Sequence, residues 1–269
     1  QDQRIVTSIN GNNISVVYRD YTDEDLFNLI APVVVDKDGN VVDGVAITSI
    51  DLTDPYTLEG RVVSDTAYTV NFKFAGNDTH RPSEAAFTVT VTKADLAMDL
   101  PNVVTTYGEG YSTAPTYTMG NKYGVRDEID ESLIKFLIGL DVNELDINGD
   151  GVHGLQSRVQ LILPADLQKL LDGILGLTGE DTSDGTEMSL SKLMEYLAPL
   201  EDTSVTALKQ ILESISGITE LGDITIVIGG KDPVDVGAYL YGAVSTNPNY
   251  ETAYDAAYIL IKPQTTEYT

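Results

Sequence analysis

Alternating apolar and polar side chains dominate the first third of the chain. Over residues 69–74, apolar side chains alternate with threonine, asparagine and lysine, and residues 87–92 repeat the pattern with threonine at each polar position. A period of two puts the apolar side chains on one face of a half-buried strand. A turn cluster at Asp36–Asn40 lies between two short valine runs, which predicts a hairpin. Only Asp23–Leu29 has a helical pattern, so residues 1–94 are predicted to form a β-sandwich.

The spacing of apolar residues becomes helical after about Asp127. Two segments carry the apolar stripe of an amphipathic helix. The first begins near Pro164, and the second has Thr203 or Ser204 as its predicted N-cap. A glycine and then an apolar residue follow each stripe, an ending in which the glycine takes a left-handed conformation. The stripes are Leu167, Leu170, Leu171, Ile174 and Leu175 before Gly176, and Val205, Leu208, Ile211, Leu212 and Ile215 before Gly217.

Two more leucine-rich segments complete the helical region. Residues 133–140 and 190–197 are each predicted to form a helix, which gives about four helices within 127–221. Strand patterns return at 224–228 and at 258–261. The hydrophobic pattern therefore predicts a mainly β protein with an α insertion.

A spaced motif occurs once in each β-rich region. Ala67-Tyr68 is followed by Ala85-Ala86-Phe87, which opens the next strand. The interval from Ala67 to Ala85 is 18 residues. Ala238-Tyr239 is followed at the same interval by Ala256-Ala257-Tyr258. Both intervals contain a polar turn. A matched interval with matching ends predicts one strand–turn–strand unit built twice.

Further short motifs surround this repeat. Thr106-Tyr107-Gly108 precedes the helical region, Asn249-Tyr250 and Ile259–Lys262 follow it, and Thr90–Lys93 stands directly before Ala94. In their order and spacing, these motifs resemble those of bacterial immunoglobulin-like surface repeats, especially the MBG type.

The resemblance covers roughly residues 60–126 and 222–263. It implies two immunoglobulin-like β-sandwiches in tandem, the second interrupted by a helical subdomain. Under this interpretation the first domain is 1–94 and the second is 95–269, with sandwich strands in 95–126 and 222–269 and the helical insertion at 127–221. The family's binding properties do not extend to the insertion, which the repeats lack.

Composition narrows the classes of partner. The 269 residues include 42 acidic and 16 basic ones, for a formal charge of −26. Such a charge repels phosphate backbones and anionic lipids, so neither nucleic-acid binding nor docking on a membrane surface is expected. The chain has no cysteine, which excludes disulfides and cysteine nucleophiles. It also has no apolar run long enough to span a membrane, so membrane insertion is not expected. It begins with no signal sequence, which a mature fragment would lack.

The sharpest local motif is an acidic loop. Asp146, Asn148 and Asp150 place oxygen ligands at positions 1, 3 and 5, and Gly151 stands at position 6, as a calcium loop requires. Position 12 is Ser157, where calcium loops have a bidentate carboxylate. Calcium is therefore one interpretation of this loop, and a plain Asn-Gly/Asp-Gly turn is the other.

The function expected from these observations is non-catalytic. Neither histidine lies in a nucleophile motif, and no phosphate-binding glycine loop occurs. We expect an extracellular monomer, part of a bacterial cell-surface or secreted protein, that serves in adhesion or display or as a stalk and meets a protein or glycan ligand on a host or neighbouring cell. The 15 tyrosines leave an alternative open: a carbohydrate-binding module of a larger glycan-degrading protein, because tyrosine offers a ring together with a hydroxyl.

Overall fold

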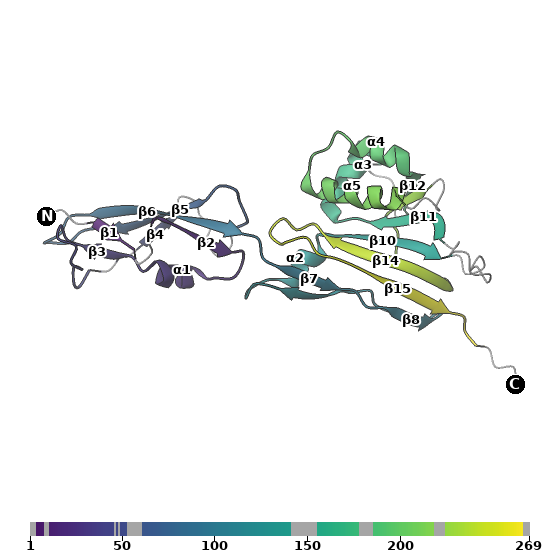
Figure 1. Cartoon of the computed structure of the whole chain (residues 1–269), viewed down its shortest axis with the longest axis horizontal. Helices are drawn as coiled ribbons and strands as arrows, with labels where there is room; N and C mark the ends of the chain where they lie inside the picture. The colour runs from purple at the N-terminus through teal and green to yellow at the C-terminus, as the bar shows by residue number, and fades with distance from the viewer. Residues whose placement is uncertain are drawn as a thin grey trace. The chain divides into compact units, whose positions relative to one another are not determined.

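The computed structural model describes residues 4–7, 11–45, 47, 49–52, 61–140, 155–177, 185–217 and 224–265. The protein is mainly β with α elements, as the hydrophobic pattern predicts (Figure 1). The chain divides into two compact units. Unit 1 comprises residues 1–95, 119–124 and 248–251, and unit 2 comprises 96–118, 125–247 and 252–269.

The described residues of unit 1 form two sheets and one helix. Its elements are β1 (Arg4–Val6), β2 (Asn13–Val17), α1 (Asp23–Ile30), β3 (Val33–Val35), β4 (Ser49–Leu52), β5 (Tyr68–Phe74) and β6 (Ser83–Thr92). The larger sheet has the order β2-β6-β5-β4, and β1 pairs antiparallel with β3 in a second sheet. Within the larger sheet, β6 is parallel to β2 and antiparallel to β5.

The core of unit 1 confirms the predicted alternation. Val70, Phe72 and Phe87 are almost fully buried, and the rings of the two phenylalanines meet edge to face at 6.5 Å. Ile5 of β1 and Val34 of β3 pack in the same cluster, so the core joins both sheets. Burying each such side chain contributes roughly 1.5–3 kcal/mol.

Helix α1 closes this core through two buried side chains, Leu26 and Ile30. Its start is fixed by a capping box: the Thr22 hydroxyl accepts the Asp25 N–H, and the Asp25 carboxylate accepts the Thr22 N–H. These two bonds satisfy backbone groups that would otherwise have no partner at a helix end.

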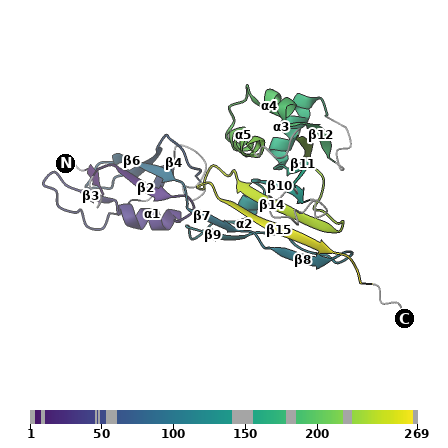
Figure 2. The same ribbon diagram turned by 45° about the vertical axis from the view of Figure 1, so that its right-hand side comes forward.

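Unit 2 is built on a seven-stranded sheet with the order β12-β13-β11-β10-β14-β15-β8 (Figure 2). The elements after β6 are β7 (Leu96–Asp99), β8 (Val103–Thr106), β9 (Thr116–Met119), α2 (Arg126–Asp130), β10 (Leu133–Leu140), β11 (Leu155–Ile162), α3 (Ala165–Leu175), β12 (Thr186–Ser189), α4 (Leu190–Leu197), α5 (Thr203–Ser216), β13 (Thr225–Ile228), β14 (Gly237–Ser245) and β15 (Tyr254–Lys262). β7 and β9 form a separate two-stranded sheet.

Three helices, α3, α4 and α5, pack on one face of this sheet. Their apolar stripes meet strands β10, β11 and β13 in a single cluster. The most deeply buried members are Ile134, Val159, Leu161, Leu171, Leu193, Leu197, Val205, Leu208, Leu212 and Ile226. The helices predicted at 167–175, 190–197 and 205–215 are thereby confirmed.

The prediction of a helix at 133–140 is wrong, because these residues form strand β10. β10 lies between β11 and β14, so its flanking strands satisfy its backbone on both edges. Side chains on both of its faces are buried, for example Leu133, Ile134 and Leu137. A strand covered on both faces has a continuous apolar run without alternation, which cannot be distinguished from a buried helix by period.

The segment 127–221 is consequently not helical throughout. Strands β10, β11 and β12 lie within it, and β10 pairs with β14 over eight residues. The helices thus cover a sheet to which this segment itself contributes three of seven strands, and they do not form a separate block.

The helix ends agree with the predictions only in part. Gly176 is left-handed with φ 72°, and the Leu177 N–H donates to the Asp172 carbonyl at 2.8 Å, so the predicted ending of α3 is confirmed. Gly217 after α5 is right-handed with φ −72°, so the same prediction is wrong there. The N-cap of α5 is Asp202 and neither Thr203 nor Ser204, because the Asp202 carboxylate accepts the Ser204 N–H.

The two predicted repeat hairpins have the same arrangement of strands. β5 and β6 pair antiparallel, as do β14 and β15. In each case an early strand adds in parallel to the closing strand, β2 beside β6 and β8 beside β15. The registers differ by one position: Tyr68 faces Val89, whereas Tyr239 faces Ile259.

The parallel strand also ends in the same turn in both units. After β2, the Tyr18 N–H donates to the Thr92 carbonyl at 2.8 Å, and the Asp20 N–H donates to the Val17 carbonyl. Arg19 between them is left-handed, with φ 51°. After β8, the matching bonds run from Tyr107 to Lys262 at 2.8 Å and from Glu109 to Thr106, around left-handed Gly108. We call these the Tyr18 turn (17–20) and the Tyr107 turn (106–109).

Candidate binding cleft

A cleft of about 460 Å³ lies beside helix α5 in unit 2. Helix α5 contributes one row of residues, one turn after another, that includes Ala207, Ile211 and Ser214. Strands β10 and β14 contribute the second group, which includes Phe136 and Leu240. This volume falls within the range of small-molecule sites. The remaining lining residues are Ile138, Gln210, Ile215, Val244, Thr252 and Tyr254.

A glycine leaves room for the ring of Phe136 at this cleft. Gly242 of β14 pairs directly with Phe136 of β10. A Cβ atom at position 242 would overlap the ring of Phe136, so the ring occupies the space of the missing side chain. Gly242 thus helps to position Phe136, which lines the cleft.

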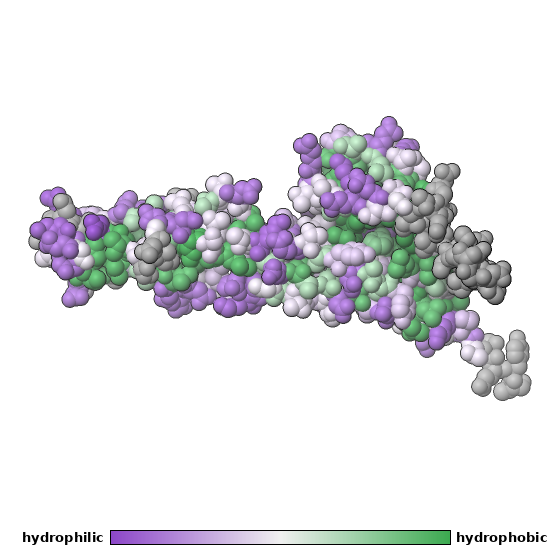
Figure 3. All heavy atoms as spheres, in the orientation of Figure 1, coloured by the Kyte–Doolittle hydropathy of each residue, from purple (hydrophilic) through white to green (hydrophobic). Residues whose placement is uncertain are grey.

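The sheet face continues beyond the cleft with further exposed side chains. Tyr254 faces Val244 and Tyr258 faces Leu240 across the β14–β15 ladder, so both tyrosines lie on the same side of the sheet as the cleft residues. Tyr254 is 60% exposed and Tyr258 is 47% exposed. Figure 3 shows hydrophobic atoms gathered over β10 and β14, below the helices.

The polar groups of the cleft are uncharged. Gln210 and Ser214 come from α5 and Thr252 precedes β15, and none of the described lining residues is ionisable except the phenol of Tyr254. In a chain with a formal charge of −26, this is a neutral patch. Aromatic rings together with amide and hydroxyl groups can hold a neutral ligand through stacking and hydrogen bonds.

Several tyrosines elsewhere in unit 2 have a pKa that is raised by burial. Burial raises the pKa of Tyr111 and of Tyr241 to about 12, with nearby carboxylates adding to the effect. The Tyr111 hydroxyl donates to the Pro233 carbonyl, and the Tyr241 hydroxyl donates to the Pro101 carbonyl. These phenols are held neutral as donors to the backbone, so their raised pKa values do not mark a proton-transfer site.

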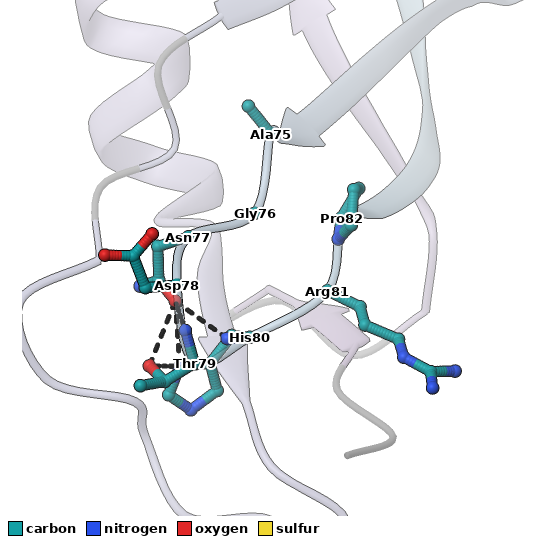
Figure 4. Close-up of a pocket in the computed structure, with 8 residues that line it drawn as sticks. All are labelled: Ala75, Gly76, Asn77, Asp78, Thr79, His80, Arg81 and Pro82. Atoms are coloured by element: carbon teal, nitrogen blue, oxygen red, sulfur yellow. Dashed lines mark hydrogen bonds between the residues drawn. The ribbon is translucent and has the colours of Figure 1, made fainter.

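A second hollow lies within the turn of residues 75–82 in unit 1, shown in Figure 4. The Asn77 carboxamide oxygen accepts the N–H groups of Thr79 and His80 and also the Thr79 hydroxyl. Asn77, Thr79 and His80 therefore bond to one another within the turn, and His80 takes part in holding the turn's own conformation.

The calcium prediction falls outside the part of the chain that is described. Asp146, Asn148 and Asp150 lie within 141–154, so calcium binding by this loop stays a prediction. Among the described residues, no group of three or more acidic, histidine or cysteine side chains is placed to hold a metal ion.

Sequence reasoning missed the cleft. Tyr254 and Tyr258 lie in a tyrosine-rich part of the sequence, but the helix predicted at 133–140 would not place Phe136 opposite β14. Gly242 was the available signal, since a glycine inside a strand often marks a close approach by another group.

No protein-family model matches the chain, and no curated protein matches it. None of the helices in the described residues is long and apolar enough to cross a membrane.

Proposed function

We propose that the chain is a non-catalytic part of a bacterial cell-surface or secreted protein, in which two immunoglobulin-like modules serve in adhesion or display. The recurrent unit carries this proposal. It consists of a closing hairpin, a parallel strand beside it and a tyrosine turn at the end of that strand. Together with the surface-repeat motifs around Tyr107 and Tyr250, this recurrence favours a modular extracellular protein.

Labelling of intact cells tests the location. An antibody raised against the chain is expected to label unpermeabilised source cells or to detect the protein in the culture medium. Brief protease treatment of intact cells should remove the cell-bound signal. Labelling that appears only after permeabilisation would contradict the proposal.

A second candidate function is neutral-glycan binding by the cleft, and the aromatic face around it favours this candidate. Phe136, Tyr254 and Tyr258 offer ring surfaces on one side of the sheet, next to the amide of Gln210. Sugar rings present apolar faces that stack on aromatic side chains, while their hydroxyls require uncharged hydrogen-bonding partners. Under this proposal the chain would be a carbohydrate-binding module.

A glycan microarray with matched variants tests the cleft. Tyr254→Ala is expected to lower binding of neutral glycans by roughly tenfold, because loss of one stacking contact of about 1.4 kcal/mol changes affinity by that factor. Tyr123→Ala removes a tyrosine that is 47% exposed in unit 1 and serves as the control. Equal binding by both variants, or no bound glycan at all, would reject a glycan site here.

A further inference from the structure

The Tyr18 turn of unit 1 is covered by two loops from a distant part of the chain. The Tyr123 N–H donates to the Arg19 carbonyl at 2.9 Å, and the Lys122 N–H donates to the Asp20 carboxylate at 3.0 Å. The Asn121 carboxamide donates to the Tyr18 carbonyl at 2.8 Å. Each polar group of the turn that faces these loops therefore has a partner within unit 1.

The second loop adds an aromatic contact and a short backbone ladder. The ring of Tyr250 meets the ring of Tyr18 edge to face at 5.6 Å. Ala94 bonds through its N–H to the Asn249 carbonyl and through its carbonyl to the Glu251 N–H. As a result, Tyr18 is only 4% exposed and Tyr250 only 1% exposed.

The Tyr107 turn has the same backbone but lacks such a cover. Tyr107 is 47% exposed, whereas Tyr18 is 4% exposed. In the described part of the chain, no N–H is bonded to the carbonyls of Tyr107 and Gly108, the counterparts of Tyr18 and Arg19. Glu109 stands where Asp20 stands, so the turn also presents a carboxylate at the matching position.

We propose that the Tyr107 turn is a docking site for an additional module of the same repeat type. That module would cover the turn with two segments, an Asn-Tyr turn and a loop of N–H donors. They would correspond to residues 248–251 and 119–124, which cover the Tyr18 turn. The occupant follows from the chemistry of the first turn. One tyrosine ring packs edge to face on another, backbone N–H groups meet one carbonyl and a carboxylate, and an asparagine carboxamide meets the second carbonyl. Such contacts combine burial of aromatic area with charge-assisted hydrogen bonds.

This inference rests on the modular part of the proposed function. It is independent of cellular location and of the cleft. A failure to dock would therefore leave the antibody-labelling and glycan experiments unaffected, and a failure of those experiments would not remove the docking site.

An extended chain provides the test. Lys262 corresponds to Thr92, because each accepts the N–H of the tyrosine in its turn. A second copy of residues 93–265 is therefore joined directly after Lys262. The second copy carries Tyr107→Phe, which makes its peptide distinguishable by mass. Nitration of tyrosines followed by peptide mass spectrometry then reports on Tyr107 of the first copy alone.

In the original chain, Tyr107 should be nitrated readily and Tyr18 should be protected. In the extended chain, Tyr107 should become protected by roughly tenfold or more, the change expected when the docked state outweighs the open one by about ten to one. Tyr250→Ala in the appended copy should restore its reactivity. Tyr254, exposed and remote from the turn in sequence, should stay reactive throughout.

Two outcomes would overturn the proposal. One is a Tyr107 that stays as reactive in the extended chain as in the original, with the appended copy folded. Folding of that copy is verified by hydrogen exchange of the 203–216 peptide, which is common to both copies and should give a single protected population. The other is protection of Tyr107 in the original chain that grows with protein concentration, since this would assign the turn to self-association.

Discussion

The hairpins β5–β6 and β14–β15 share their pairing and differ in what surrounds them. On β5, buried Val70, Phe72 and Phe74 alternate with partly exposed residues, because only one face of that sheet meets a core. On β14, residues 241–245 are all buried, because β10 extends the sheet and α5 covers part of its face. The same hairpin can therefore close a small core or become the centre of a larger sheet, depending on which strand joins its open edge.

The largest expected effect is a loss of stability in unit 1, where the sheet buries only one face. Phe72→Ala should destabilise unit 1 by about 3–5 kcal/mol, because a fully buried ring is replaced by a cavity. Urea denaturation with hydrogen exchange of peptides from β5 and β6 measures the loss. Val62→Ala, at a side chain that is 52% exposed, should change stability by less than about 0.5 kcal/mol. A similar loss for both variants would mean that β5 does not face a packed core.

The next largest effect concerns the β14–β15 hairpin, in which β14 is buried on both faces over residues 241–245. Gly242→Ala should cost about 1–3 kcal/mol, because its methyl group overlaps the ring of Phe136. In a Phe136→Ala background the same change should be nearly neutral. A double-mutant cycle by urea denaturation measures this coupling. Additive costs would show that the ring does not lie on Gly242.

A smaller effect tests the start of helix α5. Asp202→Ala should destabilise unit 2 by about 1 kcal/mol, because the Ser204 N–H loses its acceptor. Thr203→Ala is the matched control, since Thr203 lies in the first turn without capping the helix. The two variants are compared by thermal denaturation, and a larger loss for Thr203→Ala would return the N-cap to the residue predicted from sequence.

The smallest effect is expected at alkaline pH. The pKa of Tyr241 is about 12 in the folded protein, whereas a tyrosine in an unfolded chain titrates near 10. The stabilisation from this phenol is complete below about pH 10 and is lost as the pH rises toward 12, since only the unfolded chain releases its proton in that window. Tyr241→Phe should make stability less dependent on pH between 10 and 12. An unchanged dependence in urea denaturation at several pH values would contradict this assignment.

Calcium is tested by thermal denaturation of the chain with added calcium and with EDTA. Binding by Asp146, Asn148 and Asp150 predicts a higher melting temperature with calcium, because a ligand that binds only the folded state stabilises it. Asp146→Asn should abolish the shift. An equal melting temperature under both conditions would leave the loop as a plain turn.

The sequence correctly predicts the elements that bury only one face. The alternation at 69–74 and the stripe at 205–215 both reflect one buried face, and both were assigned correctly. Strand β10 was missed because neighbours cover both of its faces, which removes the period from its sequence. The cleft could not be predicted either, since it requires Phe136, Gly242 and Ile211 to meet from three separate elements.

The parallel pairing of β2 with β6 has a mechanical consequence. Because the strands run in the same direction, the start of β2 and the end of β6 lie at opposite ends of their shared ladder, which pairs Asn13 with Thr88 through to Val17 with Thr92. Tension applied through these two points slides one strand along the other and loads the ladder's hydrogen bonds together, where an antiparallel hairpin pulled at its open end would unzip one bond at a time. β8 and β15 repeat this arrangement, so both units have a geometry that resists stretching by shear.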